Sequence, residues 1–301
     1  IPKRGIEYVG IDIYGMSKNI FRDIKNVFLI RKSYRECERI LKKFKPDLVL
    51  GFGGYVTYPV LKAARKLNIK TFLHEQNSIV GKTNKVLGKN ADLVAVSFLS
   101  TMDQFKSAKK VIYSGNPCGE NALTTSVIKK SDVGLDNSKK LVIVVAGSLG
   151  SSTMNEKLEE FLRLSRKSNY QVLYITGPKH YEEFISGTHF SSNIKVVPYL
   201  DNLAGLMRNC DLIVTLSLPA IFIPSPYVAG NHQYYNALEI VKNNAGLMIE
   251  ENELNGKVLF EAVRDLLEDK QAYEIMKMNL KNLGKTDSSE VIVSEIKELI
   301  R

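Results

Sequence analysis

Strand-length apolar runs alternate with helix-periodic stretches along most of this 301-residue chain, and that alternation constrains the fold more than any other feature. Runs rich in Val, Ile and Leu, without a polar alternation, are typical of strands buried on both faces of a parallel sheet. A βαβ order predicts such sheets with helices on both faces. After residue 255 the pattern is purely helical. The predicted strands span residues 47–50, 70–73, 91–96, 110–114, 141–145, 171–175, 194–197, 212–215 and 220–223.

The alternation occurs twice, in one series that ends near residue 114 and in a second that starts at residue 140. A polar stretch from Thr124 to Lys140 separates the two series. A chain of this length is also long for a single hydrophobic core. We therefore predict an α/β protein with two doubly wound domains.

One connection breaks the pattern. Only four residues, Leu216 to Pro219, separate the strand that ends at Thr215 from the strand that starts at Ala220. Parallel neighbours need a crossover of about a dozen residues, usually a helix. Either these two strands pair antiparallel, or a turn and a helix are missing between Thr215 and Leu216.

Composition disfavours several classes of protein. No run approaches the roughly 18–20 apolar residues that span a bilayer, and the N-terminus shows no signal-peptide pattern. Cys37, Cys118 and Cys210 lie far apart, without a C-x-x-C pair or metal-ligand spacing. This cysteine usage indicates a reducing cytosol and predicts neither a disulfide framework nor a metal site.

The net charge of +10 is unevenly distributed. Residues 1–120 hold 22 Lys/Arg and 10 Asp/Glu, a balance of +12, whereas residues 121–301 hold 20 and 22, a balance of −2. A basic half suits an anionic membrane surface, a pyrophosphate-bearing substrate or nucleic acid, and a solvated lysine-rich surface is the alternative. Nucleic acid is disfavoured, because no recognition motif or aromatic-basic interleaving accompanies the charge.

Two glycine-rich turns follow predicted strands. Gly147, Ser148, Gly150 and Ser151 stand between a strand and a helix. Glycines there let the backbone approach a phosphate, and the helix N-terminus offers free N–H groups. The sequence "GFGGY" at 51–55 ends another strand, at the sheet edge where ligands gather in open α/β folds. Each motif alone is equally well explained as a tight turn.

Two polar clusters complete the set of candidate sites. His74, Glu75, Gln76 and Asn77 end an apolar strand, where such groups suit the recognition of hydroxyls and amides. Glu75 is a candidate general base, and His74 is a candidate base or hydrogen-bond donor. Residues 224–233 form a proline- and glycine-rich loop that leads into a helix with donors and acceptors suited to sugar hydroxyls. A structural strand end and a capped helix are the alternatives.

Taken together, these segments resemble one family far more specifically than each does alone. The chain contains, in order, "PDLVLGFGGYVTYP", "HEQN", "SGNP", "VAGSLGSSTMNEKL", "VVPYLDNLAGLMRNCDLIVT" and "NHQYYNA". This set is similar to the MurG family of bacterial peptidoglycan N-acetylglucosaminyltransferases over nearly the whole chain. The resemblance implies a GT-B fold, in which two Rossmann-like doubly wound domains face a cleft. The N-terminal acceptor domain would comprise residues 1–124 with the final helix 287–301, and the UDP-GlcNAc domain residues 136–286.

The resemblance also implies two sets of site residues, one for each substrate. In the donor set, Ser148 would contact the pyrophosphate and Leu200 the uracil. Gln233 with His232 would hold the sugar hydroxyls, and Asn77 would reach the sugar near the reaction centre. The phosphate loop would be completed by Gly147, Gly150 and Ser151. The acceptor side would be lined by Gly53, Gly54, Tyr55, His74 and Glu75.

The implied reaction is inverting transfer of N-acetylglucosamine from UDP-GlcNAc to the 4-hydroxyl of undecaprenyl-pyrophosphoryl-MurNAc-pentapeptide, without a metal or other cofactor. A base would take the hydroxyl proton, and the glycine loop at a helix N-terminus would stabilise the departing diphosphate. The basic half would meet anionic lipid at the cytoplasmic face of the bacterial inner membrane, as a peripheral protein with no nucleic-acid partner.

Three family features are absent from the 301 residues. The family opens with a glycine-rich loop ending in His, the proposed source of the base, and this chain starts beyond that point. A Ser-Gly-Ala turn and a helix with a ribose-binding Glu belong between Thr215 and Leu216, where the crossover is too short. Gly119 stands where the family has an Arg. Either loops are omitted from the sequence or the protein is truncated.

The catalytic base is therefore unassigned, and we expect the 301 residues alone not to turn over. Two other functions also fit the sequence. One is a different GT-B transferase that glycosylates a lipid such as diacylglycerol. The other is a degenerate relative that binds UDP-sugar or anionic membrane without catalysis.

Overall fold

The chain divides into two compact units, each with its own parallel sheet. Unit 1 combines Ile1–Pro117 with Asp287–Arg301, and unit 2 spans Cys118–Thr286. The prediction of two doubly wound α/β domains is confirmed by this arrangement. The computed structural model describes residues 5–15, 20–145, 152–215 and 221–301.

Unit 1 is built on four short parallel strands, each paired with the next strand along the chain. Because the pairing is parallel, the four carboxyl ends lie at the same edge of the sheet. In sheet order the strands are β1 (Leu48–Gly51), β2 (Lys70–Glu75), β3 (Leu93–Val96) and β4 (Val111–Tyr113).

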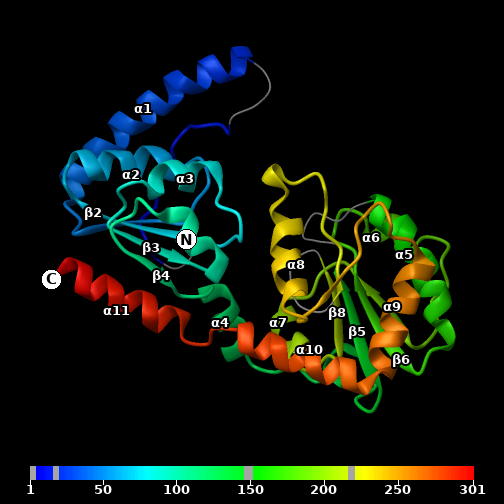
Figure 1. Cartoon of the computed structure of the whole chain (residues 1–301). Helices are drawn as coiled ribbons and strands as arrows, with labels where there is room; N and C mark the ends of the chain where they lie inside the picture. The colour runs from blue at the N-terminus through cyan, green and yellow to red at the C-terminus, as the bar shows by residue number, and fades with distance from the viewer. Residues whose placement is uncertain (1–4, 16–19, 146–151, 216–220) are drawn as a thin grey trace. The chain divides into compact units, whose positions relative to one another are not determined.

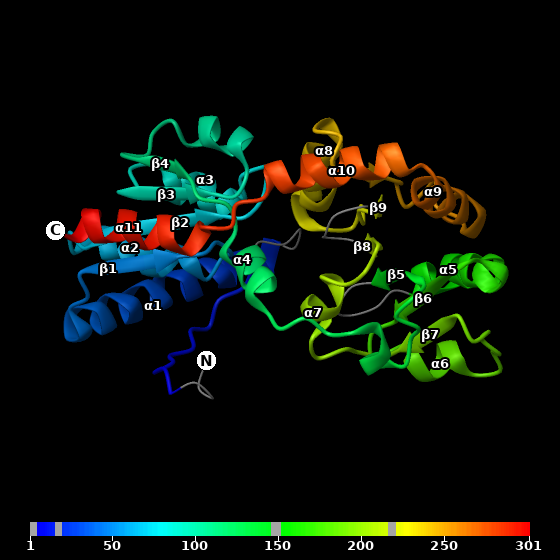
Figure 2. The ribbon, with the colours of Figure 1, turned by 90° about the horizontal axis from the view of Figure 1, so that it is seen from below.

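Helices cover both faces of the unit 1 sheet (Figures 1 and 2). One face buries Leu41, Leu61 and Leu87, and the opposite face buries Phe72 against Ile292. Each fully buried side chain of this kind contributes roughly 1.5–3 kcal/mol, so the strands are held firmly behind the site. The first face is covered by α1 (Ile20–Phe44), α2 (Thr57–Lys66) and α3 (Lys82–Gly88), and the second by the last helix of the chain, α11 (Ser288–Ile300).

Unit 2 contains six parallel strands in the order β10-β9-β8-β5-β6-β7. From β5 the chain first builds outward through β6 and β7, and it then returns to the other side of β5 to add β8, β9 and β10. This reversal places a topological switch point between β5 and β8, the position where open α/β sheets bind ligands. The strands are β5 (Lys140–Val145), β6 (Tyr170–Ile175), β7 (Ile194–Val197), β8 (Leu212–Thr215), β9 (Ile221–Phe222) and β10 (Leu247–Met248).

The unit 2 sheet also has a buried cluster on each face. One contains Phe161, Leu259 and Val263, and the other contains Ile143 and Leu206. The first lies under α5 (Ser152–Leu164) and α9 (Gly256–Glu268), and the second lies under α7 (Leu203–Met207) (Figure 1). The remaining helices are α4 (Pro117–Thr124), α6 (Tyr181–Ile185), α8 (His232–Lys242) and α10 (Lys270–Leu283).

The short connection between β8 and β9 joins parallel strands. Val214 pairs with Ile221 and Thr215 with Phe222, so the antiparallel alternative is wrong. The pairing extends over only these two residue pairs. The first residue of β9 therefore lies level with Val214, one residue, or roughly 3.3 Å, before the end of β8. A missing helix at this point stays a prediction.

The stretch predicted as a linker is fastened to unit 2. The Arg208 guanidinium donates a hydrogen bond to the carbonyl of Thr125 (2.7 Å), and the Asn202 amide donates to the carbonyl of Ser126 (3.2 Å). Nearby, the buried Lys130 ammonium donates to the Asp211 carboxylate (3.0 Å). The segment that follows α4 is thus part of the second unit.

Candidate active site

The predicted acceptor residues meet at the carboxyl edge of the unit 1 sheet. The sequence "GFGGY" follows β1, and the His74–Asn77 segment ends the neighbouring strand β2. Gly53 and Gly54 have φ angles of +85° and +75°, in the left-handed region that favours glycine. Tyr55 is exposed at this turn. The glycines therefore fold a tight loop beside the end of β2.

His74 is packed into the interior of unit 1. Its side chain is 1% exposed, and its Nε2 lies 3.1 Å from the carbonyl oxygen of Gly115. Because a carbonyl can only accept, Nε2 carries the proton and donates it. Burial lowers the pKa of His74 below its ordinary value, so the ring is neutral at pH 7. His74 thus acts as a neutral hydrogen-bond donor to the backbone carbonyl of Gly115.

Glu75 lies beside His74 and is also 1% exposed. Its Oε1 accepts hydrogen bonds from the backbone N–H and the side-chain amide of Asn77, at 3.0 and 2.9 Å. Its Oε2 accepts from the Asn84 amide at 2.8 Å and from the backbone N–H of Gly81 at 3.1 Å. One carboxylate therefore joins the end of β2 to the loop that carries Asn77 and to helix α3.

Further hydrogen bonds tie the Asn77 loop to its neighbours. Gln76 donates to the carbonyl of Phe52 in the glycine turn (2.7 Å), and Thr101 donates to the carbonyls of Asn77 (3.1 Å) and Ser78 (3.2 Å). Gln104 donates to Ser78 as well (2.8 Å). The Asn77 loop is fixed from three sides.

Sequence reasoning missed the residues that hold this loop. Asn84, Thr101 and Gln104 stand outside the glycine-rich turns and polar clusters of the sequence. Thr101 and Gln104 lie three positions apart in the 3₁₀ helix Leu99–Phe105, but Ser100 and Asp103 have the same spacing, so the pattern does not single them out. None of the three residues could therefore be identified from local pattern alone.

The predicted phosphate loop falls at the switch point of unit 2. β5 ends at Val145 and α5 begins at Ser152, so this connection follows the central strand and precedes a helix N-terminus. That position is the one that an anion-binding loop occupies in doubly wound folds. Its residues Gly147, Ser148, Gly150 and Ser151 lie outside the described residues.

The predicted sugar-binding segment also follows a strand of unit 2. The chain leaves β9, passes Gly230 and Asn231 with φ angles of +70° and +52°, and enters α8 at His232. The Gln233 side-chain oxygen accepts the backbone N–H of Ser225 at 2.8 Å. The Nδ1 of His232 is buried and has no hydrogen-bond partner within the described part of the chain. Gln233 is thus bonded within its own loop, and the His232 Nδ1 lacks a hydrogen-bond partner among the described residues.

Leu200 follows β7 at the same carboxyl edge. Its half-buried side chain packs on the cluster that contains Ile143 and Leu173. An apolar side chain in this position, with part of its surface still exposed, can support the flat face of a heterocyclic base. Its predicted contact with uracil stays a prediction.

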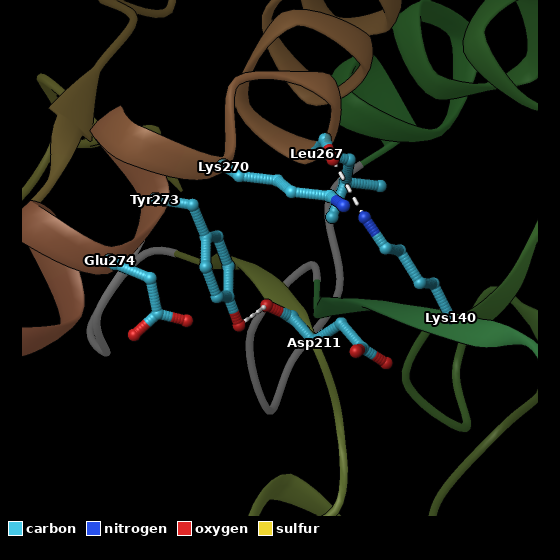
Figure 3. Close-up of a pocket in the computed structure, with 6 residues that line it drawn as sticks. All are labelled: Lys140, Asp211, Leu267, Lys270, Tyr273 and Glu274. Carbon is cyan, nitrogen blue, oxygen red and sulfur yellow. Dashed lines mark hydrogen bonds between the residues drawn. The ribbon is translucent and has the colours of Figure 1, made fainter.

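A pocket of about 270 Å³ lies at the opposite edge of the unit 2 sheet (Figure 3). It is lined by the first residue of β5, Lys140, and by Asp211 just before β8. Lys140 donates to the carbonyl of Leu267, and Tyr273 donates to the carbonyl of Asp211, both at 2.7 Å. Both side chains are thus bonded to backbone carbonyls of the protein, at the sheet edge opposite the one where the predicted donor residues lie. Nor do the described residues contain a group of three or more His, Cys, Asp or Glu that could hold a metal ion.

Comparison with known proteins covers both units. The model of the glycosyltransferase family 28 N-terminal domain matches residues 1–96, and the model of its C-terminal domain matches residues 141–292. A relative from Bacillus licheniformis is 36% identical over 99% of this chain and 86% of its own length. A relative from Bacillus cytotoxicus is 36% identical over 100% of this chain and 87% of its own. Both are named UDP-N-acetylglucosamine--N-acetylmuramyl-(pentapeptide) pyrophosphoryl-undecaprenol N-acetylglucosamine transferase.

Solved structures share the fold. MurG of Acinetobacter baumannii superposes with a TM-score of 0.76 at 24% identity, covering 99% of this chain and 86% of that one. A putative UDP-N-acetylglucosamine 2-epimerase from Listeria monocytogenes has a TM-score of 0.70 at 16% identity, covering 89% and 78%. The alignment with the Bacillus cytotoxicus relative runs over 318 residues against the 301 of this chain. The difference of 17 shows that the relative carries additional residues within the matched region.

Proposed function

The chain belongs to glycosyltransferase family 28 and, within it, to the MurG family, and from this membership we propose its reaction. The protein transfers N-acetylglucosamine from UDP-N-acetylglucosamine to the 4-hydroxyl of undecaprenyl-pyrophosphoryl-MurNAc-pentapeptide. The single observation that carries the proposal is 36% identity, over essentially the whole chain, to two transferases that bear this name.

The donor is held by the carboxyl edge of unit 2. The loop at the switch point, with Ser148 and its glycines, takes the diphosphate at the N-terminal end of α5, and Leu200 takes the uracil. Gln233 and His232 take the sugar hydroxyls. His232 supports this role because the residue is only partly buried at the start of α8 and its Nδ1 has no hydrogen-bond partner among the described residues, so a ligand that reaches it adds a hydrogen bond.

The chemical step is a displacement at the anomeric carbon. The acceptor 4-hydroxyl oxygen bonds to that carbon from the face opposite UDP, the carbon–oxygen bond to the diphosphate breaks, and UDP leaves with the bonding electrons. The hydroxyl proton passes to a base that we assign to none of the described residues. The free N–H groups at the N-terminal end of α5 stabilise the negative charge on the departing diphosphate without a metal ion.

The acceptor approaches unit 1, whose surface suits a peripheral membrane protein. Within the described residues no helix has the length and apolar character to cross a bilayer. Helix α1 exposes Val27 and Phe28, the latter with 70% of its surface free, next to exposed Arg31, Lys32 and Arg35. Apolar side chains among basic ones bind anionic lipid surfaces, at about 1 kcal/mol for each basic residue near the surface.

The deciding experiment measures transfer of labelled N-acetylglucosamine from UDP-N-acetylglucosamine to the lipid-linked MurNAc-pentapeptide. We expect a disaccharide-linked lipid and stoichiometric UDP. Transfer to diacylglycerol but not to the MurNAc lipid would assign the protein to another lipid glycosyltransferase. Binding of UDP-N-acetylglucosamine without release of UDP would identify a non-catalytic relative.

The assay is run on the protein from its natural host and, in parallel, on the 301 residues alone. The sequence predicts that the 301 residues alone do not turn over. An intact mass of the natural protein, compared with 33.8 kDa, determines whether the two samples differ.

Membrane binding is tested separately by sedimentation with vesicles. Vesicles rich in anionic phospholipid should retain the protein at low salt, and zwitterionic vesicles should not. Phe28→Ser and the double variant Arg31→Glu/Lys32→Glu should each release it. Retention by zwitterionic vesicles to the same extent would contradict an electrostatic contribution from this face.

A further inference from the structure

The hydrogen bonds of Glu75 leave it no free position for a proton from substrate. A carboxylate offers about four lone-pair positions, and four N–H groups from Asn77, Gly81 and Asn84 occupy them at 2.8–3.1 Å. The side chain is also 1% exposed. A general base must come within hydrogen-bond reach of the proton it removes. The Glu75 carboxylate is fully hydrogen-bonded within the protein.

Asn84 connects this carboxylate to the glycine turn. Its amide nitrogen donates to Glu75 Oε2 (2.8 Å) and to the carbonyl of His74 (3.3 Å). Both partners are acceptors, so the orientation of the amide is fixed, and Oδ1 faces the other way. A Cβ placed on Gly53 would lie 3.1 Å from Nδ2 and 3.4 Å from Oδ1. The amide of Asn84 therefore rests directly against the Gly53 backbone.

The burial of Asn84 excludes a direct contact with substrate. The residue is 3% exposed, and its Oδ1 is buried without a hydrogen-bond partner among the described residues. Such an unpaired atom costs about 1–3 kcal/mol, so its position is maintained by the other contacts. Any effect of Asn84 on the reaction therefore passes through its contacts with Glu75 and the glycine turn.

We infer that Glu75 and Asn84 form a positioning pair that sets the Asn77 loop and the Gly53–Gly54 turn relative to each other. Glu75 holds Asn77 by its backbone and its side chain, and Asn84 transmits the position of the glycine turn to Glu75. Neither residue exchanges a proton in the reaction. This inference deepens the proposed function and rests on it for the identity of the substrates.

The test uses Glu75→Gln, Asn84→Ala and the double variant, with Gln171→Ala as a matched control. Gln171 is likewise 3% exposed and bonds two backbone groups, but it lies in unit 2, where it holds Asp136. The readouts are kcat and KM for the acceptor as a function of pH, and the hydrogen exchange of the 77–81 amides in the unliganded protein.

In Glu75→Gln an amide NH₂ meets N–H donors, so we expect the acceptor kcat/KM to fall about a hundredfold and exchange at 77–81 to accelerate at least tenfold. Asn84→Ala, which removes no ionisable group, should lower kcat/KM about tenfold with the same exchange change. The pH dependence of the residual activity should keep its acidic limb. The double variant should be no worse than Glu75→Gln, because both act through one loop. Gln171→Ala should leave kcat, KM and the exchange at 77–81 unchanged.

Loss of the acidic limb in Glu75→Gln, with unchanged exchange at 77–81, would overturn the inference and make Glu75 the base. Unchanged exchange in Asn84→Ala would overturn the coupling to the glycine turn. The exchange measurement needs no catalysis. An inactive wild-type protein would therefore remove the proposed function while the positioning pair could still be confirmed or rejected.

Discussion

The carboxyl edges of the two parallel sheets differ in how their polar groups are bonded. In unit 1 the polar groups at the end of β2 are buried and bonded to one another through Glu75, so the loop has its shape before any ligand arrives. In unit 2 the Gln233 oxygen accepts the backbone N–H of Ser225 in the same loop, and the His232 Nδ1 is buried without a partner among the described residues, as the Asn84 Oδ1 is in unit 1. The comparison indicates that the loop of unit 1 is preorganised by bonds to neighbouring segments, whereas the described Gln233 bond of unit 2 stays within one loop.

The amino edges of the same sheets are alike in design. Asp92 precedes β3 and accepts the backbone N–H of Thr71 in β2, and Asp211 precedes β8 and accepts that of Leu141 in β5. Each aspartate also pairs with a lysine. The two edges differ in the burial of that lysine. The same aspartate–lysine ion pair can therefore be tested with an exposed lysine and with a buried one.

The largest effect is expected from Lys130→Met, compared with Lys109→Met. The side chain of Lys130 is 9% exposed and that of Lys109 is 67% exposed. Lys130 also donates to the carbonyl of Lys139, so its removal leaves two acceptors without their donor and should destabilise unit 2 by about 1–3 kcal/mol, whereas the pair with the exposed lysine contributes about 0–1 kcal/mol. Urea unfolding of both variants checks this. Equal losses would show that burial of the lysine does not distinguish the two edges.

The next effect concerns the preorganised loop of unit 1. Gly53→Ala and Gly54→Ala both force an alanine to a positive φ, at about 1–2 kcal/mol each. Only the alanine at 53 would also press on Asn84, because a Cβ on Gly54 meets nothing within 4 Å. We expect Gly53→Ala to lose about tenfold more transferase activity than Gly54→Ala. Equal losses would mean that backbone strain alone limits this turn.

A smaller effect should appear on the donor side. Gln233→Ala should weaken binding of UDP-N-acetylglucosamine about tenfold, the loss of one to two hydrogen bonds, and binding of UDP less than twofold. Isothermal titration with both ligands measures this. Equal losses for the two ligands would contradict the assignment of Gln233 to the sugar.

The smallest effect is a dependence of stability on pH through His74. Burial lowers the pKa of His74, so below about pH 6.5 the unfolded chain binds a proton that the folded chain does not. The free energy of unfolding should therefore fall as the pH drops from 7.5 to 5.5, and His74→Gln should reduce that fall. Urea midpoints at both pH values check the sign. An equal fall in both proteins would assign the acid sensitivity to other groups.

The sequence by itself predicted every described strand except β10, because parallel strands covered on both faces leave an unbroken apolar run, whereas β10 has only two residues at the sheet edge. All four residues from Leu141 to Val144 are at most 1% exposed, and every predicted strand has its counterpart in the structure. It also placed the glycine turns, since Gly53 and Gly54 adopt backbone angles that other residues resist. The long helix α1 was not assigned, because its many charged residues obscure the apolar face that it buries on α2.

The tertiary structure alone decided what the polar residues do. The sequence offered Glu75 as a candidate base, but the positions of Asn77, Gly81 and Asn84 around it depend on three segments packing together. The parallel pairing of β8 with β9 likewise depends on a register of two residue pairs. Local patterns specify which segments are buried, since burial follows hydrophobicity residue by residue. Hydrogen-bond partners are set by distances between segments remote in sequence, and those distances exist only once the chain has folded.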